Sequence, residues 1–116
     1  MALLDAETVA GLRALESDSE PGLLKTLCET FTADAEKRFA AMKTALAEDK
    51  ADVAGREAHA LKSSSASLGA LGMSTLCKEF EAIAKEGRPA AELVPLLARI
   101  ETEWPALKTE LQRELV

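Results

Sequence analysis

Apolar residues recur at every third or fourth position along most of the chain, and this helical spacing constrains the fold more than any other feature. No strand-like alternation extends beyond a few residues, and the composition is dominated by residues that favour helices. The clearest stretch covers residues 20–47, where the apolar stripe consists of Leu24, Leu27, Cys28, Phe31, Ala35, Phe39, Met42 and Leu46. The pattern predicts an all-α protein.

Breaks in the apolar pattern divide the chain into five predicted helices. Asp5 is a candidate N-cap for the first, and Gly69 is placed to end the third in a left-handed cap. Pro95 fits a first helical turn, whereas Pro105 is expected to kink the last helix. A turn is expected at residues 17–22 and a short connection at residues 69–72. The predicted helices are residues 5–15, 20–47, 49–68, 73–86 and 90–114.

Four of these helices are long and amphipathic and are joined by short connections, which predicts an antiparallel up-and-down four-helix bundle. The short first helix is expected to act as a lid, and residues 1–116 are expected to form a single domain. The remaining core faces are predicted to be Val9, Leu12 and Leu15 in the first helix, Met73, Leu76, Cys77, Phe80, Ile83 and Ala84 in the fourth, and Leu93, Leu97, Ile100, Trp104, Leu107 and Leu111 in the last.

The charge and the rare residue types exclude several classes of function. Fourteen basic and 20 acidic residues give a net charge of −6, which disfavours nucleic acids and anionic membranes as partners. No apolar run approaches the roughly 20 residues of a membrane span, and the N-terminus lacks a basic signal region, so a cytoplasmic protein is expected. The two cysteines, Cys28 and Cys77, are expected in the core, and a single histidine rules out metal sites that need two imidazoles.

That single histidine, His59, is predicted to face away from the core. At about 100° per residue, the apolar positions of residues 49–68 gather on the opposite side of the helix from His59. The residues on that opposite side are Ala54, Ala58, Leu61 and Leu68, together with Ser65. The residues around the histidine are Asp52, Gly55, Arg56, Lys62, Ser63 and Ala66. The sequence therefore predicts a solvent-facing imidazole at the centre of a polar face with small residues, which a second protein could approach closely.

An exposed imidazole is mostly neutral near pH 7, so one of its ring nitrogens can act as a nucleophile. Lys62 lies one turn further along the helix, where its ammonium can reach an anion bound at His59. By spacing alone, this pair fits the capture of a phosphoryl group, a hydrolytic dyad of His59 with Ser63, or no function. The hydrolase is disfavoured, since the sequence has no Gly-rich nucleophile elbow and no evident oxyanion hole.

The segment His-Ala-Leu-Lys-Ser-Ser-Ser-Ala-Ser-Leu-Gly-Ala, residues 59–70, resembles the signature of histidine-containing phosphotransfer (HPt) domains. The shared features are the histidine, a hydrophobic residue two positions on, a lysine at the third position, small residues, and a hydrophobic residue followed by glycine. The downstream residues Leu76, Cys77, Phe80 and Glu81 resemble the family's next helix. The resemblance extends over essentially the whole chain.

The resemblance implies a role for each residue of this face. His59 would accept a phosphoryl group from an aspartate of one receiver domain and pass it to an aspartate of another, and Lys62 would steady the phosphoryl charge. Ser63 stands where the family often has glycine, so its hydroxyl could crowd the receiver or hydrogen-bond the imidazole or phosphoryl group. Glu81 matches a position where some relatives carry glutamine, and its carboxylate could orient the ring. The receiver-docking face would comprise Asp52, Gly55, Arg56 and Ala66.

The resemblance also implies the partners, which are receiver domains of hybrid histidine kinases and of response regulators. Mg²⁺ would be bound by the receiver, so no metal or other cofactor is expected on this chain. The chain would then be a phosphoryl carrier without catalytic turnover of its own, not an enzyme. The start at Met1 and the end just past the last predicted helix favour a free-standing protein, and a monomer is the simplest expectation. The alternative is a helical adaptor that binds a receiver without being phosphorylated.

Overall fold

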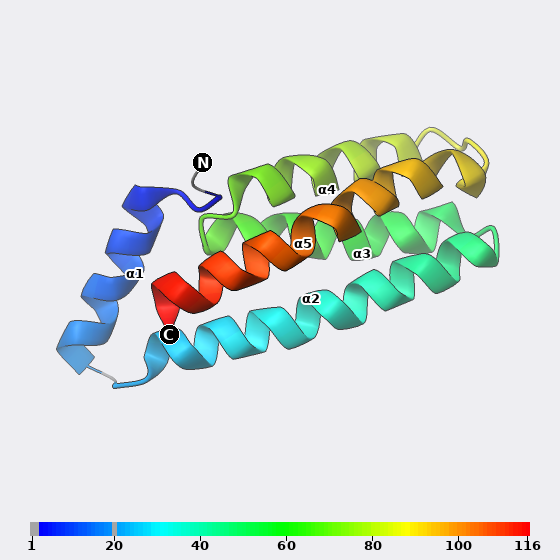
Figure 1. The fold of residues 1–116 in the computed structure, drawn as a ribbon. Helices are drawn as coiled ribbons and strands as arrows, with labels where there is room; N and C mark the ends of the chain where they lie inside the picture. The colour runs from blue at the N-terminus through cyan, green and yellow to red at the C-terminus, as the bar shows by residue number, and fades with distance from the viewer. Residues whose placement is uncertain (1–2, 20) are drawn as a thin grey trace.

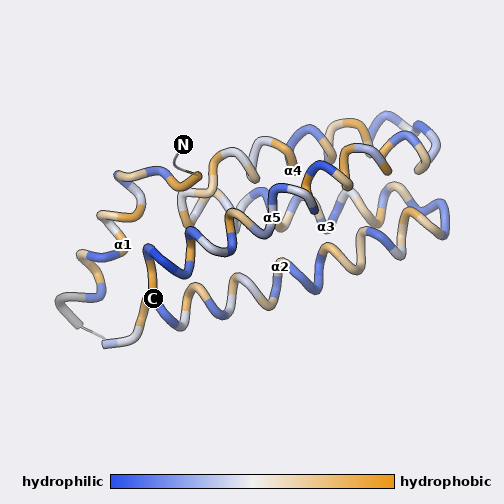
Figure 2. The backbone as a smooth tube through the Cα atoms, in the orientation of Figure 1, coloured by the Kyte–Doolittle hydropathy of each residue, from blue (hydrophilic) through white to orange (hydrophobic). Residues whose placement is uncertain are grey.

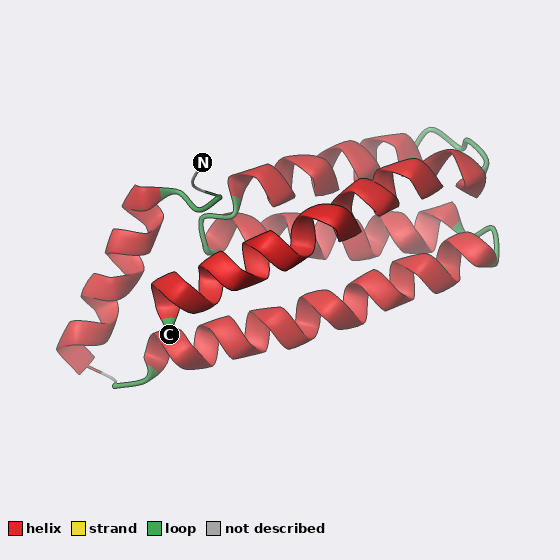
Figure 3. Ribbon diagram, in the orientation of Figure 1, coloured by secondary structure: helices red, strands yellow, loops and turns green. Residues whose placement is uncertain are grey.

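The computed structural model describes residues 3–19 and 21–116, and every regular element in that part of the chain is helical (Figures 1 and 3). The prediction of an all-α protein is therefore confirmed. The elements are α1 (Ala6–Ser19), α2 (Leu23–Ala47), α3 (Ala51–Ser67), α4 (Leu71–Ala84), a 3₁₀ turn at Ala90–Leu93, and α5 (Val94–Leu115).

Helices α2 to α5 lie side by side and alternate in direction, which is the predicted up-and-down bundle (Figure 1). Helix α1 stands apart at one end of the bundle, near the start of α2 and the end of α5. At that end the backbone amide of Asp5 donates to the carbonyl of Gly69 over 2.8 Å, which ties the start of α1 to the connection between α3 and α4.

The core is built from the predicted apolar stripes, which turn inward along all four bundle helices (Figure 2). Leu27 and Ile83 are half-buried rather than buried. The prediction of a buried Leu15 is wrong, since this residue is 58 % exposed. Because α1 stands beyond the end of the bundle, only its first part reaches the core: Val9 is buried and Leu12 is half-buried. The confirmed buried residues include Leu24, Phe31, Phe39, Met42, Met73, Leu76, Phe80, Leu97, Ile100, Trp104, Leu107 and Leu111.

Both cysteines lie in this core, as predicted. Burial raises the pKa of the Cys28 thiol, and it raises the pKa of Cys77 to about 12. A thiol with a raised pKa stays protonated near neutral pH and is a poor nucleophile. The sulfur atoms therefore serve as apolar filling.

Several predicted helix ends differ from the structure by a few residues. Helix α1 continues to Ser19, beyond the predicted turn at residue 17, and the predicted start of the next helix at Glu20 lies outside the described residues. Helix α2 begins at Leu23, after Gly22 in a left-handed conformation (φ 87°). The connection before α4 is shorter than predicted, since α4 already begins at Leu71.

The predicted caps and the predicted position of Pro95 agree better with the structure. The carboxylate of Asp5 accepts a hydrogen bond from the amide of Thr8 over 3.1 Å, as an N-cap does. Gly69 has φ 82° and follows the last turn of α3. The predicted last helix begins as a 3₁₀ turn, and Pro95 then lies in the first turn of α5. In residues 3–19 and 21–116, no helix is long and apolar enough to cross a membrane.

Candidate functional site

His59 lies midway along α3 with its side chain directed away from the core. Its side chain is 60 % exposed, whereas its neighbours Ala58 and Leu61 are fully buried. The predicted orientation of the imidazole is therefore confirmed. The helix produces this contrast, because residues one and two positions apart point in widely different directions.

Glu81 of α4 reaches across to the imidazole, where its carboxylate contacts His59, Lys62 and Lys85. Its Oε2 lies 2.5 Å from Nδ1 of His59, and its Oε1 lies 2.7 Å from Nζ of Lys62. Lys85, one turn further along α4, places Nζ 3.5 Å from Oε2. The Glu81 side chain is only 9 % exposed, so it is not a solvated surface charge.

The charge of Glu81 determines which ring nitrogen of His59 carries the proton. The hydrogen bond from Lys62, together with that of His59, lowers the pKa of Glu81 to about 2 although burial opposes the shift. The carboxylate is therefore ionised near neutral pH and can only accept hydrogen bonds. This assigns the proton to Nδ1 of His59 and leaves the lone pair on Nε2.

The second ring nitrogen is the reactive one in this arrangement. In the part of the chain that the structure describes, Nε2 has no hydrogen-bond partner and the ring is open to solvent. Asp52, Arg56 and Ala66 are exposed on the same helix, as predicted, and Arg56 pairs with Asp52 over 3.3 Å. Ser63 is also exposed, and its hydroxyl makes no hydrogen bond to the ring within the described residues.

Gly55, which was predicted on the docking face, is buried, although it lines the hollow beside His59. An added Cβ at Gly55 would lie 2.7 Å from Cβ of Ala84 on α4. Projection of α3 alone could not show this, since the neighbour that covers Gly55 belongs to another helix. Gly55 therefore serves the close approach of α3 and α4.

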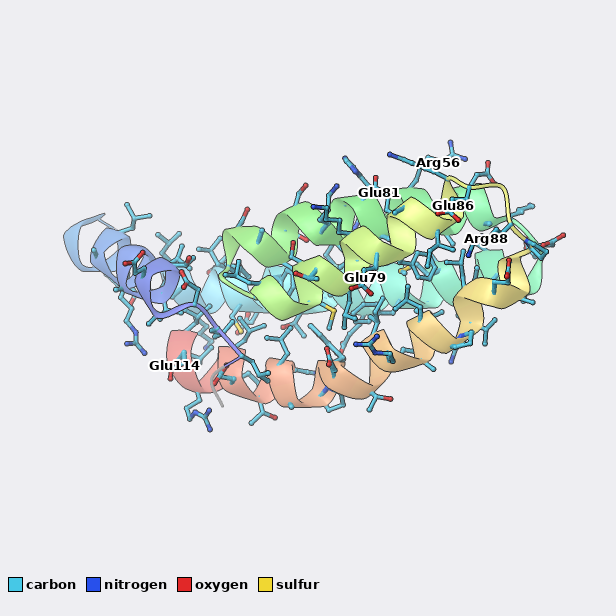
Figure 4. The ribbon with its side chains drawn as sticks, turned by 90° about the horizontal axis from the view of Figure 1, so that it is seen from above. Arg56, Glu79, Glu81, Glu86, Arg88 and Glu114 are labelled. Atoms are coloured by element: carbon cyan, nitrogen blue, oxygen red, sulfur yellow. The ribbon has the colours of Figure 1, made fainter. Side chains whose placement is uncertain are left out.

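The two helices together form a shallow hollow beside the imidazole. Figure 4 shows Arg56 and Glu81 on the same side of the molecule, on neighbouring helices. A hydrogen bond from the hydroxyl of Ser74 to the carbonyl of Lys62, 2.9 Å long, also joins α4 to α3. The hollow is lined by Asp52, Gly55, Arg56, His59, Glu81, Ala84 and Lys85.

Comparison with known proteins decides the family. The family model described as Hpt domain matches residues 26–114, which is most of the chain. The chain belongs to the Hpt domain family. Membership indicates a phosphotransfer intermediate of a phosphorelay.

Named relatives of this Hpt domain occur in plants and bacteria. The chain is 33 % identical over 105 residues to histidine-containing phosphotransfer protein 2 of Arabidopsis thaliana, covering 87 % of this chain and 66 % of the relative. It is similar to the crystal structure of histidine-containing phosphotransfer protein B from Pseudomonas aeruginosa PAO1, with a TM-score of 0.82, 29 % identity, and 97 % and 93 % of the two chains covered. The chain is also similar to the crystal structure of ZmHP2 from maize. The TM-score is 0.85, the sequence identity is 26 %, and the match covers 98 % of this chain and 88 % of ZmHP2.

Lys85 is the residue of this site that the sequence analysis missed. It could have been found from its spacing, because it lies four residues after Glu81 and so shares one face of α4 with it. The described residues hold no cluster of three or more His, Cys, Asp or Glu side chains that could bind a metal ion. The ionisable groups in contact at this site are His59, Glu81, Lys62 and Lys85.

Replacing Gly55 by alanine is expected to destabilise the Hpt domain. The new methyl group would meet Cβ of Ala84, which cannot turn away, and overpacking of this kind costs about 1–3 kcal/mol. This exceeds the gain of up to about 1 kcal/mol from removing a helical glycine. Urea unfolding should show a lower midpoint for Gly55→Ala and recovery in the double variant with Ala84→Gly. Gly72→Ala, where nothing lies within 4 Å of the new Cβ, is the control, and an equal response at both glycines would contradict the close contact.

Glu81→Gln is expected to lower the stability of the domain in a pH-dependent way. The pKa of Glu81 is lowered in the folded protein to about 2, from an ordinary value of 4.5, so the ionised carboxylate favours the folded state. Its contribution is complete above about pH 4.5 and is lost as the pH falls towards 2. Denaturant unfolding should therefore separate the variant from the wild type most clearly near pH 7. A difference that stays constant down to pH 2 would show that the charge is not responsible.

Proposed function

We propose that this Hpt domain accepts a phosphoryl group on Nε2 of His59 from an aspartyl phosphate of one receiver domain and passes it to an aspartate of another. The single observation that carries the proposal is the hydrogen bond between Nδ1 of His59 and Glu81, 2.5 Å long. It holds the proton on Nδ1 and directs the lone pair of Nε2 to the solvent, where a phosphorylated partner can meet it.

The transfer step is an in-line displacement at phosphorus. The lone pair of Nε2 forms the N–P bond, and the P–O bond to the donor aspartate breaks, so its electron pair leaves as a carboxylate. The reverse displacement by a second aspartate regenerates neutral His59. The receiver supplies both the carboxylate and Mg²⁺ in this proposal, and the Hpt domain supplies the oriented nucleophile. It needs no cofactor of its own and has no independent turnover.

Lys62 and Lys85 are proposed to provide positive charge within reach of the transferred group. Both ammonium groups contact Glu81, which in turn contacts the imidazole. Their side chains are flexible, so each ammonium can shift towards phosphoryl oxygens while it stays near the carboxylate. Such charge–charge contacts are the main contribution that a protein makes to phosphoryl transfer.

The receiver is proposed to dock on the exposed part of α3 around His59 and on the adjoining edge of α4. Asp52, Arg56 and Ala66 are the exposed residues of α3 in this surface, and the receiver is proposed to place a loop in the hollow beside the ring. The carrier is proposed to be monomeric and cytoplasmic, with the imidazole open to two receivers in turn.

Phosphotransfer profiling against the receiver domains of the source organism tests the proposal. Incubation with phosphorylated receivers should give a label on the Hpt domain that is stable to alkali and lost in acid, as expected for phosphohistidine. Loss of label from the receiver should accompany its gain by the Hpt domain. Tight binding of a receiver without transfer of label would contradict the proposal and favour the adaptor.

A further inference from the structure

We propose that Glu81 is a positioning residue for release of the phosphoryl group: its carboxylate keeps the proton on Nδ1 of the phosphorylated His59 ring, so that the group stays transferable at neutral and alkaline pH. The inference rests on the proposed function and extends it from acceptance to release. Its starting point is that a carboxylate, not a neutral side chain, contacts Nδ1.

The protonation of the ring determines how easily the N–P bond breaks. With phosphorus on Nε2 and a proton on Nδ1, the ring is a phosphorylated imidazolium. When an acceptor oxygen attacks phosphorus, the electron pair of the N–P bond returns to Nε2 and neutral imidazole leaves, with its proton still on Nδ1. A ring that had lost this proton would have to leave as imidazolate, which is a much poorer leaving group. Release therefore slows once the Nδ1 proton is lost.

The contacts around the phosphorylated ring favour a proton on Nδ1. Glu81 is nearly buried, where little water screens its charge, and its Oε2 lies 2.5 Å from Nδ1. The other ionisable side chains around the ring are Lys62, Arg56 and Asp52 from α3 and Lys85 from α4. Arg56 and Asp52 pair with each other and largely cancel. The two lysines weaken the effect of Glu81, but neither donates to the ring, so the direct contact dominates.

Glu81→Gln separates the charge of the side chain from its shape. A glutamine amide can accept a hydrogen bond from a protonated Nδ1 or, after turning, donate one to a deprotonated Nδ1. It therefore favours neither form. Glu79→Gln is the matched control, because Glu79 is an exposed glutamate of the same helix and lies on a different side of α4 from Glu81 (Figure 4).

The experiment phosphorylates the domain chemically with phosphoramidate, without any receiver, and follows the ³¹P NMR signal of phosphohistidine as a function of pH. The ³¹P shift reports protonation of the ring. The midpoint of the titration is expected to lie about one pH unit lower in Glu81→Gln than in the wild type and in Glu79→Gln. The rate at which the phosphoryl group is lost should fall at correspondingly lower pH in Glu81→Gln.

Equal midpoints for the wild type and Glu81→Gln would overturn the inference, even if the variant is less stable, because a merely structural role changes stability and not the titration. If Glu81→Gln does not fold, the wild type unfolded in urea replaces it, and the folded midpoint must then exceed the unfolded one. Failure of the wild type to form phosphohistidine on His59 at all would instead contradict the proposed function.

Discussion

Replacing His59 by glutamine is expected to abolish phosphoryl acceptance and leave the fold intact. The side chain is 60 % exposed and contributes nothing to the core, so the free energy of unfolding should change by no more than about 0.5 kcal/mol. The glutamine amide can still donate a hydrogen bond to Glu81, but it offers no nucleophilic nitrogen. Transfer from a phosphorylated receiver should therefore fall to background, while circular dichroism and thermal unfolding match the wild type.

The matched control is Lys43→Gln, which also replaces an exposed helical side chain by glutamine but lies on α2, away from the imidazole. It should accept phosphate at the wild-type rate. Label that remains on His59→Gln would identify a different nucleophile. A large loss of stability in His59→Gln would show that the imidazole has a structural role, which contradicts its exposure in the structure.

The direction of His59 could be predicted because it depends on one helix only. The angle between His59 and the buried residues Ala58 and Leu61 is fixed by helix geometry, whatever the neighbouring helices do. Helix geometry predicted the direction of the imidazole, and the resemblance to the HPt signature predicted that it accepts a phosphoryl group. For the same reason the apolar stripes of the four bundle helices were predicted nearly completely.

Features that depend on how two helices pack together could not be predicted from the sequence. Gly55 was predicted on an open face and is covered by Ala84, and the burial of Glu81 among cations follows from how closely α3 and α4 approach each other. The predicted burial of Leu15 was wrong for a related reason. The spacing of apolar residues shows which face of a helix is apolar, but it does not show where the helix projects beyond its neighbours. Projection gives the faces of a helix but not the element that covers each face.

Helix ends were also less certain than helix faces. A turn of helix adds only local hydrogen bonds, so a glycine, proline or polar pair can shift the end by a few residues at little cost. Helix α4 thus begins at Leu71, immediately after the glycine turn. These shifts leave His59 and Glu81 in place, since both lie well inside their helices.

Replacing Leu61 by aspartate is expected to unfold the domain, although the substitution lies only two residues from the exposed His59. Leu61 is fully buried, and removing a buried leucine side chain costs about 2–5 kcal/mol. Burying an unpaired carboxylate adds several kcal/mol more. Because the total stability of a domain is only about 5–15 kcal/mol, the sum removes most or all of it. Circular dichroism should show the loss of helix, or of a cooperative thermal transition, at pH 7.

Ser63→Asp is the control for Leu61→Asp, because it adds the same charge to the same helix at an exposed position. Its stability should stay within about 0.5 kcal/mol of the wild type. The contrast between positions 61 and 63 measures the orientation of α3, and with it the direction in which the imidazole of His59 points. A helical Leu61→Asp variant with a wild-type melting transition would mean that α3 is rotated about its axis, and the solvent-facing Nε2 on which phosphoryl transfer depends would then be lost.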